Sequence, residues 1–323
     1  MIFDLTPTLP GRGFILERKK TLITITLLAA LAAAVGYALD RRIVDQMGRT
    51  ITVPENPKRI VSLAPNITEI LFAVGAGEVV VGVSEFSDYP EAARSLPKVG
   101  TYIKPNLERI VELSPDVVIA TADGEKEKEI AKLHTLGIPV YVINPTDVSG
   151  IITTVREIGK LVSQEEKAES LARKMEERIN DVRERVKGLK RVRVLLTLSV
   201  EPIITISSGT FQDDLIKIAG GTNIAAGERV RYPRFSIEEV IVRAPEVIVV
   251  TTMYPGETYR RANEIWSRFE AVPAVAAGRI HVINSDIVDR PSPRIVDGLY
   301  ELSRLLHPEA FPEGGVRGDA DGN

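Results

Sequence analysis

Two stretches of this 323-residue chain decide its fold. Residues 106–119 read NLERIVELSPDVVI and residues 236–249 read SIEEVIVRAPEVIV, an offset of 130 positions (236 − 106). Each stretch begins with a helix-capping residue, continues as a short helical pattern and, after a proline and an acidic residue, becomes a β-branched run typical of a buried strand. A second echo, VYVIN at 140–144 against IHVIN at 280–284, has an offset of 140 (280 − 140). The chain is therefore predicted to contain two related lobes.

Strand and helix patterns alternate around these repeats. Strands are predicted at 59–63, 78–83, 116–120, 140–143, 192–196, 246–251 and 280–283, and helices at 66–74, 107–113, 126–136, 212–218, 237–242 and 295–306. The helix at 66–74 is expected to begin with Asn66 as its N-cap and Glu69 at the third helical position. This alternation predicts an α/β fold with mostly parallel central sheets.

Residues 148–189 carry no strand signal and are predicted to be a helical connector. Apolar residues from Ala168 to Leu189 recur at steps of three and four, which favours one long helix of about 24 residues and roughly 36 Å. A capping box at Ser163 and Glu166 is expected to start it, and Gly188 to end it. A coiled-coil dimerisation arm is the alternative. Because a helical connector resists bending, we expect only a small closure of the lobes around a ligand.

The N-terminus has the pattern of an export signal. Arg18-Lys19-Lys20 precedes an apolar run at 21–35, with small residues suited to cleavage after Ala34 or Ala38; a retained membrane anchor is the alternative. We expect an exported chain, in the periplasm or on the outer face of the cytoplasmic membrane if the segment is kept. The predicted divisions are 1–38 signal or anchor, 39–57 leader, 58–147 N-terminal lobe, 148–189 connector, 190–311 C-terminal lobe and 312–323 disordered tail.

Composition excludes several classes of function. Lysine and arginine number 41 against 44 acidic residues, so a net charge of −3 and the lack of a long basic run argue against a nucleic-acid partner. There is no cysteine and only three histidines, which argues against thiolate chemistry and a multi-histidine metal site. Neither a nucleophile elbow nor a phosphate-binding loop motif occurs. We therefore expect a protein that is not an enzyme and has no metal site.

Four segments, in order, carry a family resemblance. They are PKRIVSLAPNITE at 57–69, SDYP at 87–90, NLERIV at 106–111 and RPSPRI at 290–295. Together they resemble the periplasmic substrate-binding proteins of ABC importers whose lobes are joined by one helix, which serve vitamin B12, ferric siderophores and haem. The similarity runs from Lys58 to Leu306 and is greatest to the members that bind vitamin B12. It implies two lobes with a ligand cleft between them, a monomer, and a membrane permease as partner.

The resemblance assigns docking residues, and the repeat supports them. In the family, one exposed glutamate on each lobe forms salt bridges with arginines of the permease, and by position these correspond to Glu108 and Glu238. Both fall in the first turn of a short predicted helix, where the helix dipole favours a carboxylate, and they are related by the same offset of 130. Paired charges on two lobes can orient a docking partner.

The resemblance also implies a ligand site. Aromatic rings that suit a large macrocycle are expected from Phe86, Tyr102 and Tyr232, and polar contacts from Asp286, Asp289 and Arg290. Arg290 could instead be a structural partner of Asp286 or Asp289.

The predicted ligand is a corrinoid, with no resident cofactor. Two departures from the B12 pattern, Thr121 in place of a tryptophan and a sole Trp266 in a helix, keep haem and ferric siderophores as alternatives. A signalling or adhesion module built on the same fold is an alternative of another class.

Overall fold

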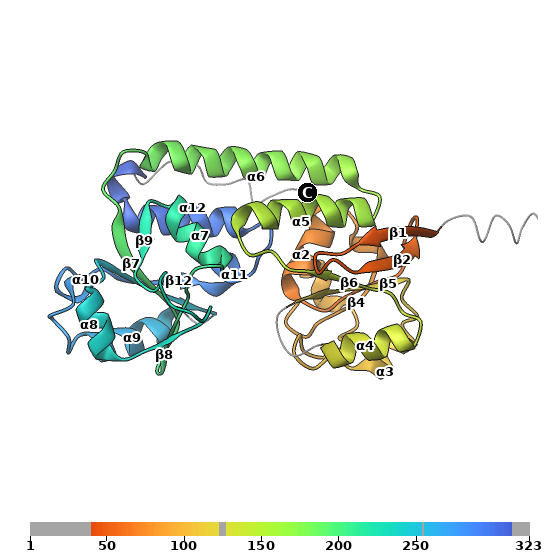
Figure 1. Ribbon diagram of the computed structural model, residues 1–323, viewed down its shortest axis with the longest axis horizontal. Helices are drawn as coiled ribbons and strands as arrows, with labels where there is room; N and C mark the ends of the chain where they lie inside the picture. The colour runs from red at the N-terminus through yellow and green to blue at the C-terminus, as the bar shows by residue number, and fades with distance from the viewer. Residues whose placement is uncertain (1–39, 123–126, 254, 312–323) are drawn as a thin grey trace, which may run out of the picture.

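A computed structural model describes residues 40–122, 127–253 and 255–311. The predicted signal or anchor at 1–38 and the predicted tail at 312–323 therefore lie outside the described residues. Two α/β lobes lie side by side beneath the long helix α6 (Glu165–Val186) (Figure 1). None of the helices in the described ranges is long and apolar enough to cross a membrane.

The N-terminal lobe is built on a four-stranded parallel sheet. Its strands are β3 (Ile60–Ser62), β4 (Val80–Val83), β5 (Val117–Thr121) and β6 (Val140–Ile143), in the order β4-β3-β5-β6. Its helices are α2 (Pro65–Ala73), η1 (Gly77–Val79), η2 (Glu91–Ser95), α3 (Leu107–Glu112) and α4 (Glu127–Thr135). All residues of β5 and β6 are buried, as expected for parallel strands covered on both faces.

A hairpin of β1 (Asp40–Val44) and β2 (Thr50–Pro54) covers the edge of this sheet. In its turn, the backbone N–H of Gln46 donates to the carbonyl of Val142 at 3.1 Å, so the free edge of β6 is satisfied. The sequence predicts only a polar leader here, because two buried residues, Ile51 and Val53, are too few to reveal a strand.

The C-terminal lobe has a larger, mixed sheet. Its strands are β7 (Val192–Val200), β8 (Ile203–Thr205), β9 (Gly221–Asn223), β10 (Arg234–Phe235), β11 (Val247–Thr252) and β12 (Ile280–Asn284), in the order β10-β8-β7-β11-β12 with β9 also paired to β7. Strand β8 is antiparallel to both β7 and β10, whereas β7, β9, β11 and β12 are parallel. Its helices are α7 (Phe211–Ile218), α8 (Ile237–Arg243), α9 (Pro255–Trp266), α10 (Pro273–Ala276), α11 (Ser285–Val288), α12 (Ile295–Leu306) and η3 (Pro308–Ala310).

The connector contains the predicted long helix, α6, and a second helix that precedes it. Helix α5 (Val148–Leu161) packs against α6, and a Cβ on Gly159 would collide with the Cβ of Ala168, so glycine permits their close approach. The expected capping box is wrong: Ser163 has φ 55° and lies in the turn, and α6 starts at Glu165 without a side-chain cap. At 22 residues, α6 is roughly 33 Å long and contacts α5, α7 and α12.

The expected start of α2 is also wrong. The helix begins at Pro65, after an extended Ala64, and no side chain caps it. Proline suits the first helical position because its missing N–H would have no partner there. Asn66 and Glu69 are thus inside the helix and buried, so the Glu69 carboxylate is available for contacts elsewhere.

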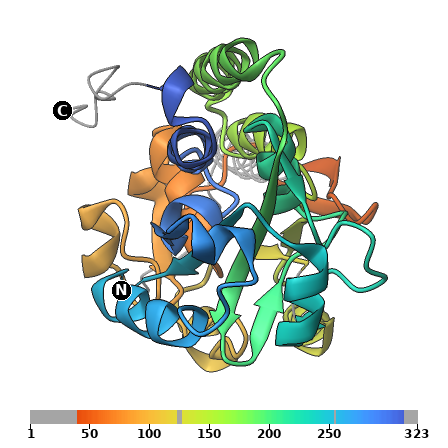
Figure 2. The same cartoon turned by 90° about the vertical axis from the view of Figure 1, so that its left-hand side faces the viewer.

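Hydrophobic cores divide the molecule by layer. One continuous core runs through α2, α5, α6, α7 and α12 and belongs to both lobes (Figures 1 and 2). Below the sheets each lobe has a core of its own, around α3 and α4 in the N-terminal lobe and around α8, α9 and Trp266 in the C-terminal lobe. The lobes are therefore joined by shared packing as well as by the chain.

Candidate functional site

The two glutamates predicted to dock occupy equivalent places. Glu108 and Glu238 are exposed in the first turns of α3 and α8, which lie on the side of the molecule away from α6 (Figure 1). Each helix is capped, by Asn106 in the N-terminal lobe and by Ser236 in the C-terminal lobe. The structure thus keeps the symmetry that the sequence repeat indicates.

The caps differ in chemistry. Asn106 accepts a hydrogen bond from the Arg109 amide, while Ser236 forms a full capping box with Glu239. Hydrogen bonds from the backbone N–H of Glu238 and from the Ser236 hydroxyl lower the pKa of the Glu238 carboxyl below its usual value.

The loop after β4 presents Phe86. Its ring is 50% exposed, and the loop is fixed beneath it by hydroxyl contacts: Ser87 Oγ lies 2.8 Å from Ser84 Oγ and 3.0 Å from Thr68 Oγ1. The Lys98 ammonium donates to the carbonyl of Ser87 at 2.9 Å. Burial lowers the pKa of Lys98, an effect that Asp88 opposes. Hydrogen bonds therefore hold the loop segment next to the exposed Phe86 ring in place.

Tyr102 lies on a neighbouring loop. The backbone N–H of Glu85 donates to the carbonyl of Gly100 at 2.9 Å, which brings the Phe86 and Tyr102 loops side by side. Tyr102 is 39% exposed. Both loops follow β4, at the carboxyl end of the parallel sheet, where ligand sites of α/β proteins usually lie.

Tyr232 occupies the corresponding place in the C-terminal lobe. It precedes β10 and is 46% exposed. Along residues 232–235 exposure alternates, with Pro233 and Phe235 buried, so Tyr232 and Arg234 share the exposed face of this edge strand.

The loop after β12 reaches the other lobe. Arg290 pairs with Asp286 within its own lobe at 2.8 Å, and with Asp88 and Glu69 of the N-terminal lobe at 3.0 and 3.1 Å. Within the described residues, Arg290 is therefore an ion-pair partner of Asp286 and not of Asp289. Asp88 is two residues from Phe86 in the sequence. The inter-lobe contact of Arg290 therefore lies on the same loop as Phe86, so a predicted polar ligand residue and a predicted aromatic one are neighbours.

Asp289 has a different environment. Its carboxylate contacts Gln212 Nε2 at 3.4 Å and hydrogen-bonds Thr251. Burial raises its pKa to about 6, although these hydrogen bonds oppose the shift. The Oε1 atom of Gln212 is buried and makes no hydrogen bond in the described residues. Asp289 therefore titrates close to neutral pH beside an unsatisfied amide oxygen.

Sequence reasoning missed the centre of the inter-lobe contact. Glu69 is 3% exposed and binds Arg290, Ser292 and Arg294 of the C-terminal lobe. Arg294 also stacks over the ring of Tyr89, 4.1 Å from its centroid. No local pattern marks this set, since its partners are more than 200 residues apart; the segments SDYP and RPSPRI were the only signal.

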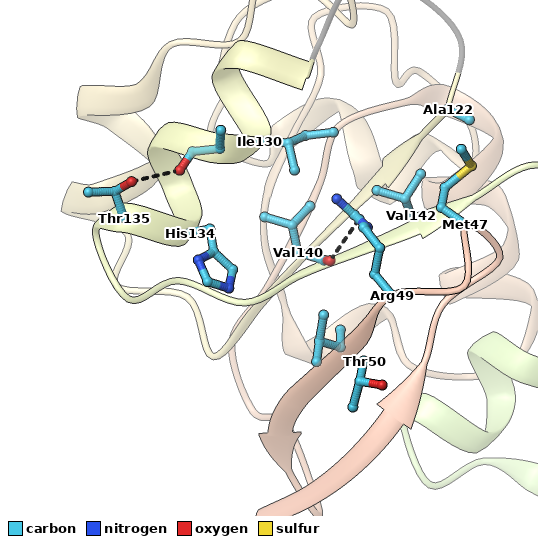
Figure 3. Close-up of a pocket in the computed structure, with 11 residues that line it drawn as sticks. Met47, Arg49, Thr50, Ala122, Ile130, His134, Thr135, Val140 and Val142 are labelled. Atoms are coloured by element: carbon cyan, nitrogen blue, oxygen red, sulfur yellow. Dashed lines mark hydrogen bonds between the residues drawn. The ribbon is translucent and has the colours of Figure 1, made fainter.

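A cavity of about 610 Å³ lies elsewhere, between the β1–β2 hairpin, β6 and α4 (Figure 3). Arg49 and His134 line it among apolar side chains, and Arg49 donates to the carbonyl of Val140. None of the predicted ligand residues lines this cavity. It is separate from the inter-lobe contact.

The structure also places the two residues at which the sequence departs from the vitamin B12-binding pattern. Thr121 ends β5 and is nearly buried, at the carboxyl edge of the N-terminal sheet. Trp266 ends α9 and is fully buried in the lower core of the C-terminal lobe, 6.5 Å from the ring of Phe269. Trp266 is therefore a core residue.

Comparison with known proteins shows which family and which solved structures this chain is similar to. Residues 60–287 match the family model described as periplasmic binding protein. The vitamin B12-binding protein of Vibrio parahaemolyticus is 32% identical over 255 residues, which cover 78% of this chain and 91% of that protein. The crystal structure of the periplasmic vitamin B12-binding protein of Vibrio cholerae superposes with a TM-score of 0.73 at 32% identity, covering 80% of this chain and all of that one. A periplasmic haem-binding protein from Roseiflexus sp. gives a TM-score of 0.70 at 26% identity, covering 78% and 99%.

Proposed function

This chain belongs to the periplasmic binding protein family, and from that premise we propose that it captures a corrinoid outside the cytoplasm and delivers it to the permease of an ABC importer. Binding proteins of this family serve ABC transporters and bind small ligands. The observation that carries the proposal is the agreement of fold and sequence with vitamin B12-binding proteins over most of both chains. The haem-binding relative is less similar in sequence, so haem is the second candidate.

The ligand would lie where the two lobes face each other. Phe86 and Tyr102 offer exposed rings from one lobe and Tyr232 from the other, which suits the flat, partly apolar face of a corrin macrocycle. Asp286, Asp289 and Arg290 would supply polar contacts to its amide side chains. Since Arg290 already pairs with three carboxylates, we propose that it reads the ligand with its remaining N–H groups.

The experiment is a competition among coloured ligands. The purified chain lacking residues 1–38 is mixed with cobalamin, haem or a ferric siderophore, and co-elution on gel filtration is read by absorbance. We expect cobalamin to co-elute at one per chain. Changing Phe86 to Ala should weaken cobalamin binding by about tenfold, whereas Tyr259→Ala, at an exposed ring on α9, should leave it unchanged. Co-elution of haem alone would transfer the assignment to the second candidate.

We further propose that Glu108 and Glu238 dock the chain on its permease. Support comes from their equivalent exposed positions on α3 and α8, on the side of the molecule away from α6 (Figure 1). Reversing both to Arg should abolish import of labelled corrinoid and leave its binding in solution unchanged. Reversal of Glu112 and Glu257, two other exposed acids, is the matched control. Loss of solution binding in the double reversal would place these glutamates in the ligand site instead.

A further inference from the structure

A single carboxylate of the N-terminal lobe holds three side chains of the C-terminal lobe. Glu69 Oε2 accepts from Ser292 Oγ at 2.6 Å and from Arg294 Nε at 2.9 Å. Its other oxygen, Oε1, accepts from Arg294 Nη2 at 2.6 Å and from Arg290 Nη1 at 3.1 Å. Both oxygens are therefore used, and the Arg294 contact is bidentate, the strongest geometry for such a pair.

These bonds join the lobes next to the shared upper core, which includes residues of α2 and α12. Glu69 lies on α2 of the N-terminal lobe, and its three partners lie in the loop between α11 and α12. The side chains of Glu69, Arg290 and Arg294 are 2%, 12% and 20% exposed, so solvent screens their attraction little. A buried carboxylate of this kind costs free energy unless it keeps all its partners. Separation of the lobes here would break four hydrogen bonds at once.

The same contact orients a residue proposed to touch the ligand. Arg290 is held from three directions by Glu69, Asp88 and Asp286, two of which belong to the opposite lobe. Its guanidinium can adopt this position only while the lobes keep their present spacing. Arg294, stacked on Tyr89, clamps the end of the loop that carries Phe86.

We propose that Glu69 is a positioning residue that sets the spacing of the two lobes and thereby fixes Arg290 for ligand recognition. The stiffness of the molecule then has two sources: the helix pair α5–α6 with its shared core, and this ion cluster. The part of the proposal that concerns Arg290 rests on the proposed function, whereas the part that concerns lobe spacing does not.

The test measures lobe spacing without any ligand. The chain has no cysteine, so Glu112→Cys on α3 and Val242→Cys on α8, both exposed, accept a spin-label pair without further changes. Pulsed dipolar spectroscopy should give one narrow distance distribution for this parent. Adding Glu69→Gln should broaden that distribution at least about twofold and move it toward longer distances, because the charge that holds both arginines is gone. Glu85→Gln, an exposed acid in the same lobe, should change nothing.

Ligand binding gives the second reading. If the loosened molecule spends about a tenth of its time with the lobes correctly spaced, the apparent Kd for cobalamin rises about tenfold. Glu69→Asp, which keeps the charge on a shorter stem, should recover part of the affinity. Should Glu69→Gln fail to fold, Ser292→Ala removes one hydrogen bond and no charge, and should broaden the distribution less.

The outcomes separate the two proposals. An unchanged distance distribution in a folded Glu69→Gln chain that has merely lost stability would overturn the positioning role. A broadened distribution in Glu69→Gln, together with a parent chain that binds no cobalamin, would keep the spacing role and count against the corrinoid assignment alone.

Discussion

The two lobes share the same helix-to-strand corner, the turn that joins α3 to β5 in one lobe and α8 to β11 in the other. They differ at the edges of their sheets. After α3 the chain turns at Ser114 (φ 43°) and after α8 at Ala244 (φ 46°), the same left-handed backbone at an offset of 130. The acidic residue two positions on performs the same task in both: Asp116 accepts from the Arg59 amide and Glu246 from the Arg193 amide, each at 2.9 Å. Even the arginines agree, since Nε of each donates to a carbonyl of the corner.

Beyond this corner the lobes diverge. The N-terminal sheet is entirely parallel, while the C-terminal sheet adds the antiparallel β8 and β10, and the offset grows from 130 to 140 before β12. The helix-to-strand corner is thus the part of the repeat under the tightest backbone constraint. The lobes differ instead in their sheet edges and in the inter-lobe loop that follows β12.

The largest expected effect on stability comes from substitutions that disrupt the two lower cores one at a time. Trp266→Ala should lower the free energy of unfolding by about 4 kcal/mol and Leu133→Ala by about 3 kcal/mol, because each empties a fully buried site. As the two sites lie in different cores, the double variant should be additive within about 0.5 kcal/mol. Urea unfolding followed by circular dichroism measures this. A coupling above 1 kcal/mol would mean that the lower cores are not independent.

The next effect concerns the Asp289 carboxyl of the C-terminal lobe, which lies in the loop between α11 and α12. A raised pKa means that the folded chain favours the protonated acid, so its stabilising contribution is present below pH 3.8 and is lost as pH rises through 6. Asp289→Asn should therefore stabilise the protein by about 2 kcal/mol at pH 7.5.

That gain should shrink as pH falls and vanish near pH 4. Unfolding at a series of pH values measures it, with Asp40→Asn, at an exposed aspartate of β1, as the control. A gain independent of pH would show that the Asp289 charge is not its cause.

A smaller effect sharpens the comparison of the corners. A left-handed backbone costs a residue with a Cβ about 1 kcal/mol, so Ala244→Gly should raise the melting temperature. Ser114→Gly should gain less, since the Ser114 hydroxyl also contacts the Val111 carbonyl at 3.5 Å. Differential scanning calorimetry compares them. A loss of stability in both variants would contradict the strain argument.

The smallest effect separates the two helix caps. Ser236→Ala and Asn106→Ala should each cost about 0.7 kcal/mol through the lost N-cap. Only Ser236→Ala should raise the pKa of Glu238, because it alone removes a hydrogen bond to that carboxyl. Carbon-detected NMR titration of the glutamates measures the shift. An equal shift in the Asn106 variant would rule out the Ser236 hydroxyl as the source.

The sequence predicts this fold best where periodicity is strong and local. The strand at 140–143 and the helix at 295–306 have the predicted bounds, and the short helices of the repeat agree within a residue. The α/β class, the parallel sheets and the long helix are confirmed. Strands β8 and β10 escaped because two or three residues give no readable period.

The site was harder to predict, for a physical reason. A spacing of four residues predicts the pairing of Asp286 with Arg290 as an alternative to ligand contact. For Glu69, by contrast, the local pattern predicts a helix-capping role, and only the folded chain brings it to Ser292, 223 positions away. The roles of Phe86, Tyr102, Tyr232, Asp289, Glu108 and Glu238 stay predictions.

The shared upper core determines how the molecule should open. Since α2, α5, α6, α7 and α12 enclose one hydrophobic interior, the unit of cooperative opening is a layer and not a lobe. Amide protons of α6 and α12 should exchange with deuterium at the rate of global unfolding. Those of α3, α4, α8 and α9 should exchange sooner, through partial opening of the lower layer. Fluctuations of the lower layer would then move the two proposed docking helices, α3 and α8, while the helices of the shared upper core stay folded.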